Sequence, residues 1–484
     1  MTPPPSATTA ADAQARNSSR RMLAVLIAPL FMALVAVSVI NVALPSIQSS
    51  LESDSTHLQW VISGYALSFG VLLIPAGRLG DATGRRRLFM IGLSIFTVGS
   101  VISALAPSIL VLNVARVLQG IGSGLLNPQT IGIMQRTFTG QARAMAFALM
   151  GTTVGLSTAI GPVMGGMLIG MLGPDLGWRW IFGMNVPVGI LALIGAARWL
   201  PCDERPRDAR RPDLDPVGTV LLAISVLGVM LPFLERKAHG LALATPVLAL
   251  GVLGVWVWWE RRYSRLGRQP MVRVDIFTQP AFRNGIALIT VHFIGITSVW
   301  ISVALFVQLS LGASALEAGL VGLPASILNA IAAQVAGRHV LRMRRLVVIL
   351  GFGFAIAGLL GAMAVIPFVN SGAWPLWALS IPLSLLGPAQ GCIVSPNQTL
   401  TLEQVDARFG GVAGGILQTG QRLGAAMGTA LIPGILFQLV ETGNSWAVAM
   451  NAALALIVAL AAIALLIAVL DRRREARISS DSSA

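Results

Sequence analysis

Residues 77–87 read Gly-Arg-Leu-Gly-Asp-Ala-Thr-Gly-Arg-Arg-Arg, and they separate two long apolar runs. The glycines allow a tight turn and a close approach of neighbouring backbone. The lone carboxylate, Asp81, can pair with the arginines around it or lie at the positive end of a neighbouring helix. The stretch therefore predicts a structured basic turn between two membrane-spanning helices.

The rest of the chain shares the apolar character of the two flanking runs. Of its 484 residues 55% are hydrophobic and only 11% are charged, and the mean hydropathy is +0.77. Soluble domains carry about 25% charged residues, so an ordinary soluble enzyme is excluded, and a polar disordered chain is excluded as well. Cys202 and Cys392 lie too far apart for a disulfide framework or a metal site, so we expect no metal and no cofactor.

Fourteen apolar runs are long enough to cross a bilayer. We predict an all-α integral membrane protein: two six-helix halves and a central helix pair. The predicted parts are a disordered tail (1–21), the N-terminal half (22–200), a linker (201–213), the central pair (214–259), a second linker (260–283), the C-terminal half (284–470) and a second tail (471–484).

The distribution of basic residues tests this count. With the N-terminus inside, 29 of the 34 basic residues fall in cytoplasmic segments, and only Arg179, Arg236 and Lys237 fall outside. The positive-inside rule produces this alternation, and a wrong number of spans would scramble it. It predicts a multi-pass protein of the plasma (inner) membrane with both termini in the cytoplasm. It also explains the net charge of +14 without a nucleic-acid partner.

The two halves repeat some of their motifs. Gly77-Arg78 near the end of the second run is echoed by Gly337-Arg338, and Gln119-Gly120 in the fourth run is echoed by Gln390-Gly391. The offsets of 260 and 271 residues fit six helices, an inserted pair and six more helices. Parallel repeats of this kind are typical of secondary transporters, whose substrate site lies between the halves near mid-membrane.

Taken together, these motifs resemble the major facilitator superfamily, and specifically its fourteen-helix drug/proton antiporter branch. The first-loop motif of that family is matched by Gly77, Asp81, Gly84 and Arg85. Its fourth-helix motif is matched by Arg116, Gln119, Gly120, Gly122 and Gly124, and its fifth-helix antiporter motif by Gly155, Gly161, Pro162, Gly165 and Gly166. The strings Asn41-Val42-Ala43-Leu44-Pro45 and Trp178-Arg179-Trp180-Ile181-Phe182 are typical of the branch.

The resemblance implies proton-coupled efflux of small amphipathic compounds across the lipid bilayer. Gly77, Asp81, Gly84, Arg85 and Arg86 would then form a cytoplasmic gate. In the fifth helix, small residues would allow close packing, and Pro162 would bend the helix.

Several polar residues lie inside the predicted spans, where they are costly. Arg116 and Arg422 carry charge at membrane depth, which costs about 2.5–3.5 kcal/mol even on lenient scales. His292, whose unperturbed pKa suits protonation near neutrality, is a candidate proton carrier, with one interhelical hydrogen bond as the simpler interpretation. Candidate substrate-cavity residues are Asn41, Gln119, Asn127, Gln129, Gln308, Asn397, Gln418 and Gln421.

One departure from the branch affects the energy source. The first helix usually carries an Asp five residues before the Asn of the Asn-Val-Ala-Leu-Pro string, and this position is Ala36 here. Three interpretations follow: proton coupling through another group, exchange of an anionic or zwitterionic substrate, or facilitated transport of a metabolite without coupling. No Gly-x-x-x-x-Gly-Lys-Ser/Thr phosphate-binding loop occurs, so we predict no ATP-binding site in this chain and no enzyme activity.

Overall fold

The computed structural model describes residues 7–203, 215–234 and 244–481, and these residues are almost entirely helical. The N half consists of seven helices: α1 (Ala7–Ser38), α2 (Ile40–Ser50), α3 (Ser55–Thr83), α4 (Arg85–Ala104), α5 (Ile109–Thr137), α6 (Gly140–Gly183) and α7 (Asn185–Trp199). A central pair follows, α8 (Pro216–Leu234) and α9 (Ala244–Arg265).

The C half begins with a short 3₁₀ turn and then repeats the long-helix pattern. Its long helices are α10 (Pro280–Leu305), α12 (Leu323–Met343), α13 (Arg345–Asn370), α15 (Leu386–Glu403), α16 (Gly410–Glu441) and α17 (Trp446–Asp481). Its short elements are η1 (Val274–Thr278), η2 (Phe306–Ser310), α11 (Ala315–Val321), η3 (Leu376–Leu379), α14 (Ser380–Ser384) and η4 (Ala407–Phe409).

Local chemistry explains several helix ends. Asp54 accepts a hydrogen bond from the backbone N–H of His57 at the start of α3, and Ser108 does the same for Val111 at the start of α5. Gly84 ends α3 with a φ of 117°, which few residues other than glycine adopt. The turn predicted from residues 77–87 is therefore only one residue long.

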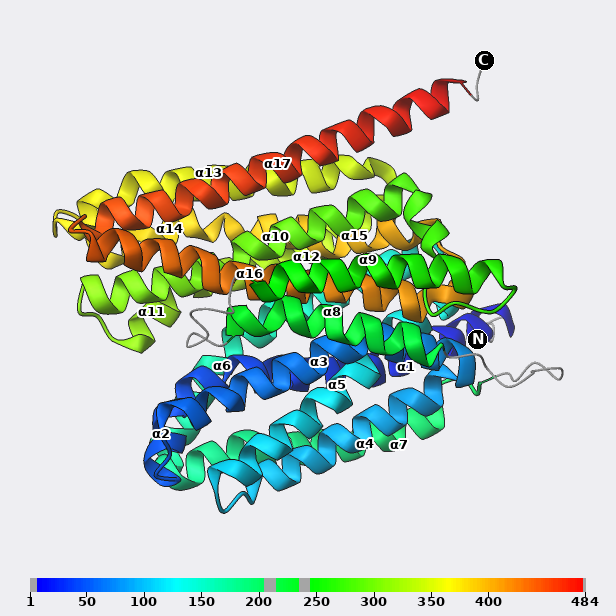
Figure 1. The fold of residues 1–484 in the computed structure, drawn as a ribbon, viewed down its shortest axis with the longest axis horizontal. Coiled ribbons are helices and arrows are strands. Elements are labelled where there is room, and N and C mark those ends of the chain that lie inside the picture. The colour runs from blue at the N-terminus through cyan, green and yellow to red at the C-terminus, as the bar shows by residue number, and fades with distance from the viewer. Residues whose placement is uncertain (1–6, 204–214, 235–243, 482–484) are drawn as a thin grey trace, which may run out of the picture.

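The helices run roughly side by side, with the N half on one side of the molecule and the C half on the other (Figure 1). Helix α8 packs against both α3 of the N half and α16 of the C half, so the central pair covers one seam between the halves. Both ends of the chain lie at the same end of the bundle (Figure 1). We call this the arginine-rich end, because Arg85, Arg345 and Arg472 lie there.

Eleven segments of the described chain are long and apolar enough to cross a membrane. One of these segments, Val163–Trp199, combines parts of α6 and α7, since only Met184 separates the two helices. The central pair adds α8, which is apolar over the shorter stretch Pro216–Met230. An all-helical bundle is thus confirmed, while a total of fourteen spans stays a prediction.

The predicted tails differ from the structure. Helix α1 already begins at Ala7, inside the segment 1–21 that we predicted to be disordered. Helix α17 continues to Asp481, and its Asp471 is only 4% exposed although the prediction placed it in a tail. The linker predicted at 201–213 lies mostly outside the described residues, as do Arg236 and Lys237.

Candidate functional site

The last turn of α3 meets the first turn of α16 at the arginine-rich end. Asp81 Oδ1 accepts a hydrogen bond from the backbone N–H of Gly411 at 3.1 Å, and Oδ2 accepts one from Val412 at 3.0 Å. The first N–H groups of a helix lack partners within the helix and carry partial positive charge. A carboxylate of the N half therefore caps a helix of the C half.

Arg85 holds this carboxylate in place. Its Nε donates to Asp81 Oδ1 at 2.8 Å, and its Nη2 donates to the Ala407 carbonyl at 2.6 Å, just before α16. The same guanidinium donates to the Gly132 carbonyl of α5. We call Asp81, Arg85 and their partners on residues 407–412 the Asp81 latch. It joins the two halves through charge-assisted hydrogen bonds, which are stronger than neutral ones.

Glycine makes the close approach behind the latch possible. A Cβ atom on Gly77 would collide with the carbonyl group of Gly411. A Cβ on Gly415, one turn further along α16, would lie 2.5 Å from the carbonyl oxygen of Leu73. The backbones of α3 and α16 are therefore in contact over two turns.

The predicted gate residues do not all face this seam. Gly77, Asp81 and Arg85 lie at the latch, and Gly84 forms the turn. Arg86 instead donates to Ala197 and to Cys202 Sγ, within the N half.

A second seam joins α6 to α12. A Cβ on Gly337, the repeat of Gly77, would collide with Ala148 of α6. Gln141 Nε2 donates to the Gly337 carbonyl at 2.9 Å, and Gln334 Nε2 donates to Thr152 Oγ1 at 2.9 Å. These hydrogen bonds, and those of the Asp81 latch, lie within about 20 Å of the arginine-rich end, counted along the helices.

The antiporter-motif helix α6 contributes to both this seam and the N half. A Cβ on Gly155 would collide with Asn329 of α12, whereas Gly161 and Gly165 face the end of α1. Gly166 has no neighbour within 4 Å of such a Cβ. The break in helical geometry inside α6 falls at Gly173, eleven residues beyond Pro162.

The residue that repeats Arg85 in the C half is Arg345, also the first residue of its helix. Arg345 is fully buried and forms an ion pair with Asp471 of α17 at 2.6 Å. Its Nη1 donates to Asn397 Oδ1 at 2.7 Å, and its Nη2 donates to the Ala281 carbonyl at 3.1 Å. All these partners lie within the C half, so this pair stabilises one half while the Asp81 latch connects two.

Away from the arginine-rich end, two arginines flank two aromatic rings. The Arg116 guanidinium carbon lies 4.5 Å from the Tyr65 ring centroid, and that of Arg422 lies 4.5 Å from the Phe69 centroid. The two rings are 5.9 Å apart. We call Arg116, Tyr65, Phe69 and Arg422 the arginine–aromatic cluster. It brings together both membrane-depth arginines that the sequence singles out, one from each half.

The two arginines differ in how well they are satisfied. Arg116 is 1% exposed; its Nε donates to the Val61 carbonyl at 2.8 Å and its Nη1 donates to Gln119 Oε1 at 2.9 Å. Arg422 is only partly buried, and its Nε has no hydrogen-bond partner in the part of the chain that the structure describes. Arg116 is thus held by hydrogen bonds within the N half, while the Nε–H donor of Arg422 is unused among the described residues.

We expect Arg116→Lys to lose most transport while still folding. The planar guanidinium contacts a carbonyl, an amide and an aromatic face at once, and a point charge cannot reproduce that geometry. The measurement is the initial transport rate in proteoliposomes, normalised to reconstituted protein. The matched control is the exposed Arg472→Lys, which should behave like the parent. Parental rates for Arg116→Lys would show that this position needs only a positive charge.

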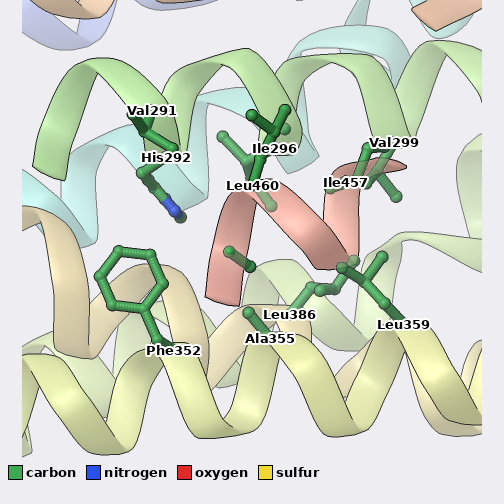
Figure 2. Close-up of a pocket in the computed structure, with 12 residues that line it drawn as sticks. Val291, His292, Ile296, Val299, Phe352, Ala355, Leu359, Leu386, Ile457 and Leu460 are labelled. Carbon is green, nitrogen blue, oxygen red and sulfur yellow. The ribbon is translucent and has the colours of Figure 1, made fainter. Parts of the chain in front are cut away.

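His292 lies away from the cluster, inside the C half. Its ring points into a small apolar pocket between α10, α13 and α17, opposite Phe352 and near Ile296 and Leu460 (Figure 2). The residue is 7% exposed, and its Nε2 has no hydrogen-bond partner among the described residues. A proton carrier needs a polar path, and these surroundings supply none, so the geometry does not support the role suggested from the sequence.

Four of the eight predicted cavity residues are buried and bond to the protein itself. Gln119 donates to Ser100, Asn127 to the Ser123 carbonyl, Gln129 to the Ala76 carbonyl, and Asn397 to the Gly285 carbonyl. Gln308 is exposed in η2, and the side chain of Asn41 lies outside what the structure describes. Gln418 and Gln421 remain beside Arg422 on α16. The described residues contain no group of three or more His, Cys, Asp or Glu that could hold a metal ion.

Sequence reasoning missed a pair of buried acids at the arginine-rich end of the central pair. Asp215 accepts a hydrogen bond from Trp259 Nε1 at 2.9 Å, and Glu260 Oε2 accepts one from the Val272 N–H at 3.4 Å. A Cβ on Gly218 would contact both carboxylates, so the two groups converge. Glu260 is one residue beyond the predicted span, and burial together with the negative charge of Asp215 raises its pKa to about 8.

This raised pKa predicts a pH-dependent stability. Between the ordinary pKa of about 4.5 and the folded value of about 8, the folded protein keeps a proton that the unfolded chain releases. Stability from this group therefore falls as pH rises through that window. We expect Glu260→Gln to lose less stability than the parent between about pH 5 and about pH 8, measured by thermal unfolding. The exposed Glu441→Gln is the control, and an unchanged pH dependence in Glu260→Gln would contradict the assignment.

Comparisons with known proteins agree with this architecture. A family model described as Major Facilitator Superfamily matches residues 26–429 and 285–483. The chain is 30% identical over 416 residues to the probable actinorhodin transporter of Streptomyces coelicolor, covering 83% of this chain and 70% of that protein. It is 31% identical over 415 residues to the multidrug resistance protein Stp of Mycobacterium tuberculosis, covering 84% and 74%.

A solved structure shows the same fold. The proton:xylose symporter XylE superposes with a TM-score of 0.63 at 16% identity, covering 93% of this chain and 95% of that one. The chain is almost entirely helical in its described part, and its relatives include proteins named for drug resistance and antibiotic transport. It belongs to the Major Facilitator Superfamily.

Proposed function

We propose that this protein exports small amphipathic compounds from the cytoplasm by alternating access, driven by the proton gradient. Its relatives include a multidrug resistance protein and a probable antibiotic transporter. The bias of basic residues supports an orientation with the arginine-rich end and both termini in the cytoplasm of the plasma membrane. In this orientation the Asp81 latch closes the cytoplasmic side of the pathway.

The Asp81 latch is the observation that carries the proposal. Asp81 can cap α16 only while the two halves are together at the cytoplasmic end. Opening that end separates the carboxylate from the Gly411 and Val412 N–H groups, so the contact belongs to one state of the transport cycle. The close-packed glycines behind it allow the halves to meet tightly and to separate without interlocked side chains.

The coupling step has to use a group other than a first-helix acid. Ala36 is fully buried in α1 where the branch usually has Asp. This substitution favours a second candidate function, a facilitator or exchanger of a neutral or anionic metabolite that works without proton coupling. Proton coupling is the primary proposal because the other antiporter motifs are present.

Reconstitution distinguishes the two functions. Proteoliposomes loaded with a fluorescent probe are given a pH gradient and a voltage separately, and flux against the probe gradient is measured. Uphill movement driven by the pH gradient supports the antiporter. If neither gradient drives uphill movement while downhill flux remains, the facilitator is the correct function. If the pH gradient drives flux, His292→Gln then tests whether that histidine contributes, and the structure leads us to expect parental coupling.

A further inference from the structure

The Arg422 guanidinium lies near the middle of helix α16, and no carboxylate pairs with it in the part of the chain that the structure describes. It is twelve residues from the start of α16 and nineteen from its end, or about 18 and 28 Å along the helix. Its Nε is buried without a hydrogen-bond acceptor among the described residues. A charge at this depth is costly unless it pairs or faces a cavity.

The surrounding helices supply no carboxylate at this level. In α3, the helix that provides Phe69, Asp81 is the only acid, about 18 Å further along the helix axis. In α16 the only acid is Glu441 at its last residue. Helices α5 and α10 contain no acid at all. The positive charge of Arg116, on the other side of Tyr65, adds to the field instead of cancelling it.

The position of Arg422 places it on the seam between the halves. The backbones of α3 and α16 touch at Leu73 and Gly415. Arg422 is two turns beyond that contact, away from the latch, and its side chain reaches back over Phe69 of the opposite half. Gln418 and Gln421, within one turn of it, add amide groups to the same region of α16.

We infer that Arg422 forms the anion-binding subsite of the substrate site, and that the preferred substrates are organic anions. A carboxylate, sulfonate or phenolate joined to an apolar or aromatic body fits best. The guanidinium offers paired N–H donors that match a carboxylate, and it lies 4.5 Å from the Phe69 ring, which is 3% exposed, so the charge has an apolar neighbour. A cationic compound in this place would meet two like charges. The inference rests on the proposed transport function, because it names the substrate class of that pathway.

Two dyes that share a xanthene core and differ in charge test the subsite. Fluorescein is anionic and rhodamine 123 is cationic, and binding of each to purified protein is measured by fluorescence anisotropy. We expect the parent to bind fluorescein more tightly than rhodamine 123. Arg422→Gln should weaken fluorescein binding about ten- to hundredfold, the loss of about one charged hydrogen bond, and should leave rhodamine 123 binding unchanged or stronger. The exposed Arg472→Gln is the matched control and should bind both dyes as the parent does.

A competition measurement keeps the test independent of how well the variant folds. Benzenesulfonate should displace fluorescein from the parent protein, and benzyltrimethylammonium should not. Equal affinity of the parent for both dyes, or unchanged fluorescein affinity in folded Arg422→Gln, would overturn the inference.

Transport of the same dyes separates the two proposals. Flux of rhodamine 123 without flux of fluorescein contradicts the anion preference and leaves the transport function intact. Arg422-dependent binding of fluorescein without flux of either dye contradicts the transport function and leaves the subsite intact.

Discussion

Asp81→Asn should reduce transport by about tenfold or more while the protein still folds and inserts. The substitution removes the negative charge at the start of α16 and leaves a single acceptor oxygen for two N–H groups. A hydrogen bond to a charged group contributes about 1.5–3 kcal/mol, so the equilibrium between the cytoplasm-closed and cytoplasm-open states should shift about ten- to hundredfold. The measurement is the initial rate of dye flux in proteoliposomes, normalised to protein.

A spectroscopic readout separates gating from misfolding. Spin labels at Arg87 and Gln404, both exposed, in a background without Cys202 and Cys392, report the distance between the halves at the cytoplasmic end. Asp81→Asn should shift this distance distribution to longer values. Asp406→Asn is the matched control, because Asp406 is at the same end but is exposed and pairs with Arg408. Parental flux and distances in Asp81→Asn would rule out a gating role.

Asp471→Asn should cause the largest loss of stability. It would leave Arg345, which is fully buried, with a guanidinium charge but no counter-charge at Nε. Removing one partner of a buried ion pair costs about 3–5 kcal/mol. We expect a clearly lower midpoint of thermal unfolding in detergent, followed by tryptophan fluorescence.

The neighbouring arginine provides the control for this experiment. Arg344 pairs with Glu403 at 3.2 Å, but these side chains are 41% and 30% exposed. Exposed pairs contribute about 0–1 kcal/mol, so Glu403→Gln should change the midpoint little. Equal effects of Asp471→Asn and Glu403→Gln would show that burial does not determine the strength of these pairs.

The fold was predictable because the bilayer restricts what a chain can do. Backbone N–H and C=O groups in lipid must form hydrogen bonds within their own segment, so a long apolar run becomes a helix. The boundaries of each run follow from the polar and turn-forming residues beside it. A short polar break is enough to separate two helices, since α4 ends at Ala104 and α5 begins at Ile109. The break at Val39 between α1 and α2 was missed, because hydropathy continues unchanged through it.

The candidate site was less predictable, because its partners are distant in sequence. Charge counting gives the side of the membrane on which Arg345 lies but not the residue it pairs with, and Asp471 looked like part of a polar tail. One usable signal was present: Arg345 follows Arg85 by the same 260 residues that separate Gly337 from Gly77. Recognising it would have shown that Arg345 needs a carboxylate, as Arg85 does.

The Arg345–Asp471 pair also affects the order in which the protein can be assembled during synthesis. Asp81 and Arg85 leave the ribosome four residues apart, whereas Asp471 follows Arg345 by 126 residues. At about 5–20 residues per second, Arg345 spends roughly 6–25 seconds without its counter-charge. The C half therefore cannot reach its final packing until helix α17 has been inserted. In a chain that stops before Asp471, Arg345 has no counter-charge, and we expect the quality-control machinery of the cell to recognise the incompletely packed half.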